Sequence, residues 1–210
     1  MKLIAAIFFH AFISFNGNEI ISQDCSNHNV NKLIHYGNKI AEQKNTDSLV
    51  MYSELFFEQF PDNFNCFHLY YSLYDSSYNN QSTISKKHGV LYDYAFQHIA
   101  QIYNNLSVIE TEKRIEMTIQ ISLGGYWEAD AVSYFQFGLR NLLENNTDSF
   151  LRIINLLDQE DQRSFWFFYF DGPNPSSSTP KSFDKIKNNY PQMFEIILRS
   201  HQDVVAKWKD

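Results

Sequence analysis

The sequence Phe-Trp-Phe-Phe-Tyr-Phe at residues 165–170, followed directly by Asp-Gly-Pro-Asn-Pro at residues 171–175, decides what kind of fold this chain adopts. Six successive aromatic side chains point to all sides of the element that carries them, whether that element is a helix or a strand. The segment must therefore be enclosed on nearly every side. The Gly-Pro step and the Ser/Thr/Pro-rich residues up to Pro180 predict that the buried element ends at the surface, where a loop displays a binding feature.

Helical periodicity and helix-ending signals cover most of the remaining chain. The pattern predicts helices at residues 29–44, 48–60, 64–74, 91–102, 107–124, 126–144, 150–157, 158–171 and 191–208. The polar residues 76–87 are expected to form an exposed connection. Residues 115–121 also fit a short strand, because apolar and polar residues alternate there, but no second alternating stretch lies nearby to pair with it. The sequence therefore predicts an all-α protein, built as a single-domain irregular bundle or a short array of antiparallel helix pairs, with eight or nine helices.

Residues 126–144 are expected to form the central helix, because their apolar residues cover most sides of it. Glu128 and Asp130 would lie in its first turn, where the helix dipole favours acidic side chains. Two residues apart on a helix they diverge by about 160°, so they cannot form a catalytic acid and base by themselves. Asp171 is the distant carboxylate that would complete such a pair across a cleft, as glycoside hydrolysis requires.

The first 22 residues are predicted to be a signal peptide. Lys2 precedes an apolar run from Leu3 to Phe15, and the small Ser22 precedes the expected cleavage point. The run is shorter than the roughly 20 residues that span a bilayer, and no later segment replaces it. We therefore expect residues 23–210 to be a single soluble α-helical domain, exported to the periplasm or the extracellular space.

Cys25 and Cys66 are the two cysteines of the chain. In an oxidising compartment such a pair is expected to form a disulfide. The alternative is that Cys25 lies in a frayed terminus and Cys66 is a small buried hydrophobic residue. No Cys or His spacing is typical of a metal site, and no motif predicts a cofactor. His98 and His201 lie on apolar stripes, where hydrogen-bonded core histidines are expected.

The formal net charge is −7, with no large basic cluster. This charge argues against nucleic acid and against anionic membrane surfaces as partners, and favours a basic protein or peptide. No nucleophile elbow or phosphate-binding glycine loop is present, so a catalytic role is not indicated by any motif. The oligomeric state is left open.

Two aromatic-polar sets are candidate binding residues. The first is Tyr70, Tyr71, Tyr74 and Tyr78, because tyrosines with one solvated end are common at interfaces. The second contains Tyr169, Asp171 and Asn174 at the end of the aromatic run, which would rim a pocket for a peptide, a glycan or a partner loop. It is grouped with Trp127, Glu128 and Asp130 as further candidate binding residues. The alternative for the second set is structural: the rings fix a helix in the core, and Asp171 braces the turn.

The segments GGYWEADA at residues 124–131 and FWFFYFDGP at residues 165–173 resemble those of small exported all-α bacterial proteins of unknown function, and more loosely of periplasmic immunity proteins. The resemblance covers about a tenth of the chain, and implies a fold and a compartment but no site residue. The predicted function is that of an exported protein-binding molecule, immunity-like or inhibitor-like. The alternatives are an enzyme acting on a cell-envelope polymer such as a glycan, and a structural or scaffold helical protein.

Overall fold

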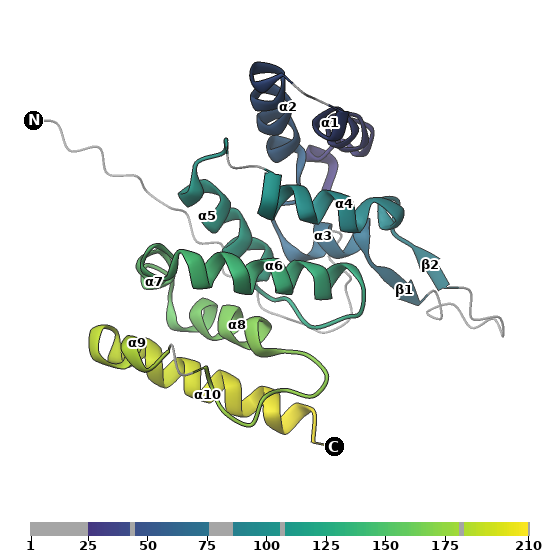
Figure 1. Ribbon diagram of the computed structural model, residues 1–210. Coiled ribbons are helices and arrows are strands. Elements are labelled where there is room, and N and C mark those ends of the chain that lie inside the picture. Colours follow the sequence, from purple (N-terminus) through teal and green to yellow (C-terminus); the bar gives the residue numbers. More distant parts are fainter. Residues whose placement is uncertain (1–24, 43–44, 76–85, 106–107, 181–182, 210) are drawn as a thin grey trace, which may run out of the picture.

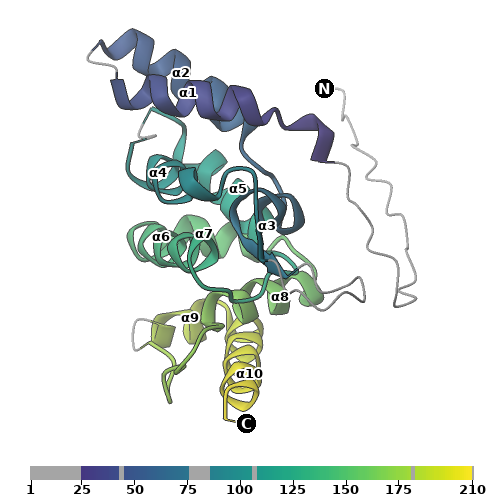
Figure 2. The ribbon, with the colours of Figure 1, turned by 90° about the vertical axis from the view of Figure 1, so that its right-hand side faces the viewer.

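The chain forms a stack of helices that runs from one end of the molecule to the other. The computed structural model describes residues 25–42, 45–75, 86–105, 108–180 and 183–209. In Figures 1 and 2, the first helix pair lies at one end of the stack and the last pair at the other. The all-α prediction is confirmed, with ten α-helices in the described part of the chain. The predicted signal peptide, residues 1–22, lies outside the described residues.

The α-helices are α1 (Val30–Glu42), α2 (Thr46–Gln59), α3 (Phe64–Tyr71), α4 (Ala95–Ala100), α5 (Thr111–Ser122), α6 (Ala131–Asn145), α7 (Thr147–Ile154), α8 (Gln159–Phe170), α9 (Asp184–Asn189) and α10 (Pro191–Lys207). Three shorter elements complete the helical part of the fold: 3-10 helices at Cys25–Asn27 and Tyr92–Tyr94, and a π-helix at Gln101–Asn105. Side-chain caps explain several starts: Asn45, Asn63 and Asp158 each accept a hydrogen bond from a backbone N–H in the first turn. Pro191 occupies the first turn of α10.

Two element boundaries, at residues 71 and 86, differ from those expected from the sequence. The helix predicted to reach Tyr74 ends at Tyr71. Ser72 has an extended backbone, and its N–H donates a hydrogen bond to the carbonyl of His68. Residues 73–75 form strand β1 (Leu73–Asp75), which pairs antiparallel with β2 (Lys86–His88). Residues 76–85 of the expected loop lie outside the described residues, and Lys86 and Lys87 belong to β2.

The helix favoured over a strand at residues 115–121 is confirmed as part of α5. Its alternating apolar residues are all buried because α5 packs against three helices, α3, α7 and α8. The spacing of Ser107 and Glu110 is typical of a capping box. Ser107 lies outside the described residues, and Glu110 at the start of α5 makes no capping bond through its side chain. Helix α9 was missed because Ile186 is the one buried residue among its described side chains, which is too few for a periodic signal.

Helix α6 lies in the middle of the stack, as predicted for the central helix (Figure 1). Val132, Phe135 and Leu139 on it are fully buried. Its start was predicted wrongly: residues 126–130 are not helical, and α6 begins at Ala131. Asp130 has a positive φ of 60°, which an α-helix does not allow, so the first five expected residues form a non-helical segment that ends in a turn at residues 129–130.

The aromatic run forms the C-terminal half of α8, which lies between α6 and α10 (Figures 1 and 2). Phe165, Trp166 and Phe168 have no exposed surface, and Tyr169 is also buried. Phe183 beside α9 packs its ring against Trp166 at 5.5 Å. The predicted enclosure of this segment is therefore confirmed, and the run ends at the surface loop 171–180.

The predicted disulfide between Cys25 and Cys66 is present. It joins the turn before α1 to α3 across a sequence separation of 41 residues. The Tyr70 hydroxyl reinforces the junction by donating a hydrogen bond to the Cys25 carbonyl, at 2.7 Å.

Candidate functional site

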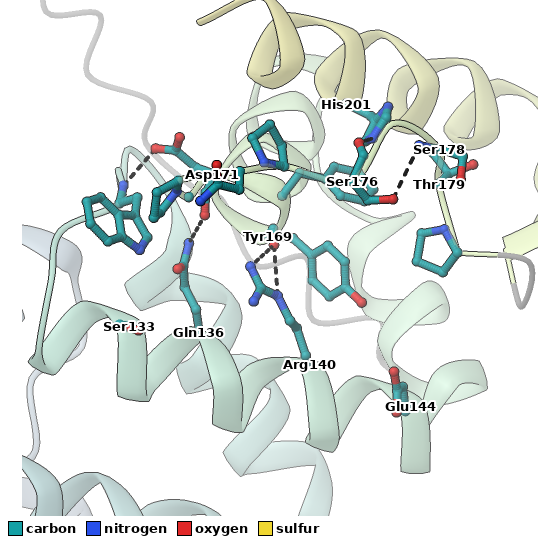
Figure 3. Close-up of a pocket in the computed structure, with 17 residues that line it drawn as sticks. Ser133, Gln136, Arg140, Glu144, Tyr169, Asp171, Ser176, Ser178, Thr179 and His201 are labelled. Carbon is teal, nitrogen blue, oxygen red and sulfur yellow. Dashed lines mark hydrogen bonds between the residues drawn. The ribbon is translucent and has the colours of Figure 1, made fainter. Parts of the chain in front are cut away.

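One candidate site is a cavity of about 680 Å³ beneath the loop 171–180, here called the loop pocket (Figure 3). One wall is the face of α6 that carries Ser133, Gln136, Arg140 and Glu144. Their spacing of three or four residues places them in one row along the helix. The opposite wall comes from the end of α8 and the loop itself, with Trp127 and His201 at the sides.

The loop is held over the pocket by hydrogen bonds from both walls. Gln136 donates its side-chain amide to the carbonyls of Phe168 and Asp171, at 2.6 and 3.0 Å. His201 on α10 donates its Nε2 proton to the carbonyl of Ser176, at 2.9 Å. His201 is thus the hydrogen-bonded buried histidine that its apolar stripe predicts. These bonds hold the loop in place and occupy part of the polar lining of the pocket, namely Gln136 and His201.

Asp171 is a buried structural anchor at the edge of this pocket. Its side chain is completely buried and accepts hydrogen bonds from the Trp127 backbone N–H at 2.7 Å and from the Trp208 indole at 2.8 Å. Lys207 contributes an ion pair at 2.8 Å. All of these partners are donors, so the carboxylate ties the end of α8 to the segment before α6 and to the C-terminal end of α10.

The three carboxylates considered for catalysis do not assemble into one site. Glu128 interacts with His68 at 2.5 Å, and Asp130 accepts the Tyr92 hydroxyl at 2.7 Å. Neither lines the loop pocket, whereas Asp171 does. The geometry therefore provides no acid and base pair from these residues.

Arg140 is the charged group at the centre of the loop pocket, and sequence reasoning missed it. It donates Nε and Nη2 to the carbonyl of Tyr169, at 3.2 and 2.9 Å, and its guanidinium lies 5.8 Å from the centre of the Tyr169 ring. Burial lowers the pKa of Arg140, which still leaves the guanidinium charged at neutral pH. Burial raises the pKa of Tyr169 to about 12, and the nearby Arg140 opposes that rise, so the phenol stays protonated.

Tyr70 and Tyr71, two of the four tyrosines predicted as an interface, do not lie on an open surface. Tyr71 is fully buried, with its hydroxyl 3.0 Å from Nδ1 of His98, and Tyr70 is 7% exposed. Both hydroxyls have internal partners instead of solvent. Tyr74 lies in β1, and Tyr78 lies outside the described residues. Of the second set, Trp127, Tyr169, Asp171 and Asn174 do meet around the loop pocket.

A second feature was not predicted. Phe96 on α4 and Tyr134 and Phe137 on α6 are 67%, 44% and 66% exposed, and together they are called the aromatic surface. The rings of Phe96 and Tyr134 meet edge to face at 5.4 Å. All three residues line a hollow of about 380 Å³. In the sequence, the indication of this surface was Phe137, an aromatic residue that lies off the main apolar stripe of its helix.

Comparison with known proteins returned no match: no family model, no curated protein and no solved structure is similar to this chain at a significant level. Within the described ranges, none of the helices combines the length and the apolar content needed to cross a membrane. The same residues include no cluster of three or more side chains suited to holding a metal ion.

Proposed function

We propose that this protein works by binding another protein, and that the aromatic surface is the contact region. The observation that carries the proposal is the exposure of three neighbouring rings around one hollow, whereas many aromatic residues elsewhere in the described chain are buried. Large exposed apolar patches on soluble proteins mark interaction sites, whereas single exposed apolar residues are ordinary.

The composition of the hollow is typical of an interface centre. Its lining includes no aspartate, glutamate or lysine, and Arg114 is its charged residue. Asn104, Asn141, Asn145 and Asn146 supply polar groups beside the rings. Interface cores are depleted of Lys, Glu and Asp and enriched in aromatic residues and Arg, with polar groups at the rim. We infer that the partner inserts an apolar side chain between Phe96 and Phe137 and bonds to the asparagine amides.

The net charge of the protein affects which partners it attracts before contact. The formal charge of −7 favours approach of a basic protein, with an association rate that falls as salt increases. An exported, immunity-like or inhibitor-like role agrees with the disulfide and with the resemblance of residues 124–131 and 165–173. In this proposal the charge steers the encounter, and the aromatic surface supplies the buried contact.

The test begins with capture of partners from the source organism by tagged residues 23–210, identified by mass spectrometry at low and moderate salt. Affinity for the purified partner is then measured by calorimetry for wild type, Phe96→Ser and Phe137→Ser. Removal of a ring at an interface centre costs about 2 kcal/mol or more, which is roughly a 30-fold loss of affinity.

The matched control is Leu156→Ser, which removes another side chain that is 79% exposed and does not line the hollow. It should leave the affinity unchanged. Equal binding by all four proteins would refute the aromatic surface as the contact region. Recovery of cell-wall fragments alone would instead favour the envelope-polymer alternative.

A further inference from the structure

The loop pocket contains a positive charge that the fold does not neutralise. Arg140 forms no ion pair with any described carboxylate. A guanidinium has five N–H groups. In Arg140, Nε and Nη2 both donate hydrogen bonds to the same acceptor, the carbonyl of Tyr169. The other terminal nitrogen, Nη1, has no hydrogen-bond partner within the described residues. Charged groups that leave bulk water are normally paired, so this half-buried cation is suited to an incoming anion.

The shape of the pocket fits a small ligand. Its volume of about 680 Å³ lies within the range of about 300 to 1,000 Å³ that small-molecule sites occupy. Trp127 and the loop prolines Pro173 and Pro175 supply apolar wall, while Ser133 supplies a hydroxyl on the α6 side. Figure 3 shows Arg140 reaching from α6 toward Tyr169, between the two walls.

The charge distribution selects the anion. Glu144 lines the same wall one helical turn beyond Arg140, and its carboxylate is exposed and forms no ion pair among the described residues. Asp171 also borders the pocket, but Lys207 neutralises it. One available cation beside one free carboxylate favours a ligand with a single negative charge and disfavours a dianion such as phosphate. A carboxylate matches the planar fork of a guanidinium.

We propose that the loop pocket binds a molecule through a single carboxylate group seated on Arg140, with the apolar body of the molecule against Trp127 and the loop prolines. This site is separate from the aromatic surface and does not depend on the function proposed for it. The carboxylate comes either from a free organic acid or from the C-terminal end of a peptide.

Titration of the full mature chain with benzoate, followed by ¹H–¹⁵N NMR, tests the proposal, with benzamide as the uncharged probe of equal shape. Benzoate should shift the indole N–H signal of Trp127, and benzamide should bind at least tenfold more weakly. Arg140→Gln should weaken benzoate binding by tenfold or more, because it removes the charge-assisted hydrogen bonds. Equal binding of the two probes, absence of any shift at 20 mM benzoate, or unchanged affinity in Arg140→Gln would each overturn the proposal.

A second variant keeps the test decisive if Arg140→Gln folds poorly. Glu144→Gln removes an exposed negative charge from the pocket and should strengthen benzoate binding by about two- to threefold. Glu116→Gln is the matched control, because it removes an exposed glutamate on α5 that does not line the pocket. Equal effects of the two variants would count against the site. Acetyl-Gly-Phe with a free or an amidated C-terminus distinguishes the sources: tighter binding of the free peptide than of benzoate identifies a chain end.

Discussion

His98 is a histidine with no exposed surface, enclosed by aromatic rings. Its ring lies 5.1 Å from that of Phe56 and stacks on Tyr94 at 5.4 Å, and Nδ1 meets the Tyr71 hydroxyl. Burial lowers the pKa of His98 from 6.5 to about 4. The side chain is therefore neutral in the fold at neutral pH, as expected for a hydrogen-bonded core histidine.

This lowered pKa predicts a loss of stability in mild acid. Between pH 6.5 and about pH 4 the unfolded chain binds a proton at His98 and the folded chain does not. The free energy of unfolding should therefore fall as pH decreases through this window, by about 3 kcal/mol at most from this residue. Urea unfolding at pH 7, 6, 5 and 4 measures the loss, and His98→Gln should show a shallower decline than wild type. His35→Gln, at an exposed histidine, is the control; equal slopes in all three proteins would contradict the assignment.

At the scale of elements, Asp171 joins α8, α10 and the segment that leads into α6. Substitution Asp171→Asn keeps the shape of the side chain but removes its charge and points an amide at groups that are all donors. We expect destabilisation of about 1.5 to 3 kcal/mol, the range for hydrogen bonds to a charged group, because Lys207 is 41% exposed and its ammonium remains solvated. Thermal unfolding measures the loss, and near-UV circular dichroism should report loosened packing of Trp127 and Trp208.

Asp203, a second aspartate that forms an ion pair, lies on α10 and provides the control. Asp203 pairs with Arg163 at 2.7 Å, but its side chain is 41% exposed whereas that of Asp171 is completely buried. Asp203→Asn should therefore cost about 1 kcal/mol or less. Similar costs for the two substitutions would show that Asp171 is not the anchor described above.

The elements also show how far the sequence could predict the structure. The burial of α8 was predictable because six consecutive rings leave no side for solvent. The non-helical residues 126–130 were not, because their conformation depends on the contact of Asp130 with Tyr92, 38 positions away. Arg140 in the loop pocket was missed for the same reason, since its partner is a backbone carbonyl 29 residues further on. Tyr71 was misplaced because its hydroxyl is satisfied by His98, a distant core residue.

At the scale of the whole molecule, the disulfide joins the turn before α1 to α3 and so encloses the first helix pair in a covalent loop. Closing a loop of 41 residues restricts the unfolded chain, and the chain-entropy model gives about 4 kcal/mol of stabilisation. We expect reduction to lower the free energy of unfolding by about this amount, measured by urea unfolding with and without a phosphine reductant. The double variant Cys25→Ala with Cys66→Ala should not respond to the reductant. Unchanged stability of the reduced wild type would contradict this account.

Helix α6 contributes a wall to two separate hollows. Ser133, Gln136, Arg140 and Glu144 face the loop pocket, while Tyr134, Phe137 and Asn141 line the hollow of the aromatic surface. A small rotation of this helix about its own axis therefore moves both walls together. By thermodynamic linkage, if binding in one hollow changes the affinity of the other hollow for its ligand by some factor, binding in the second changes the affinity of the first by the same factor. If the two proposed ligands bind, α6 is the shared element through which each would change the affinity for the other.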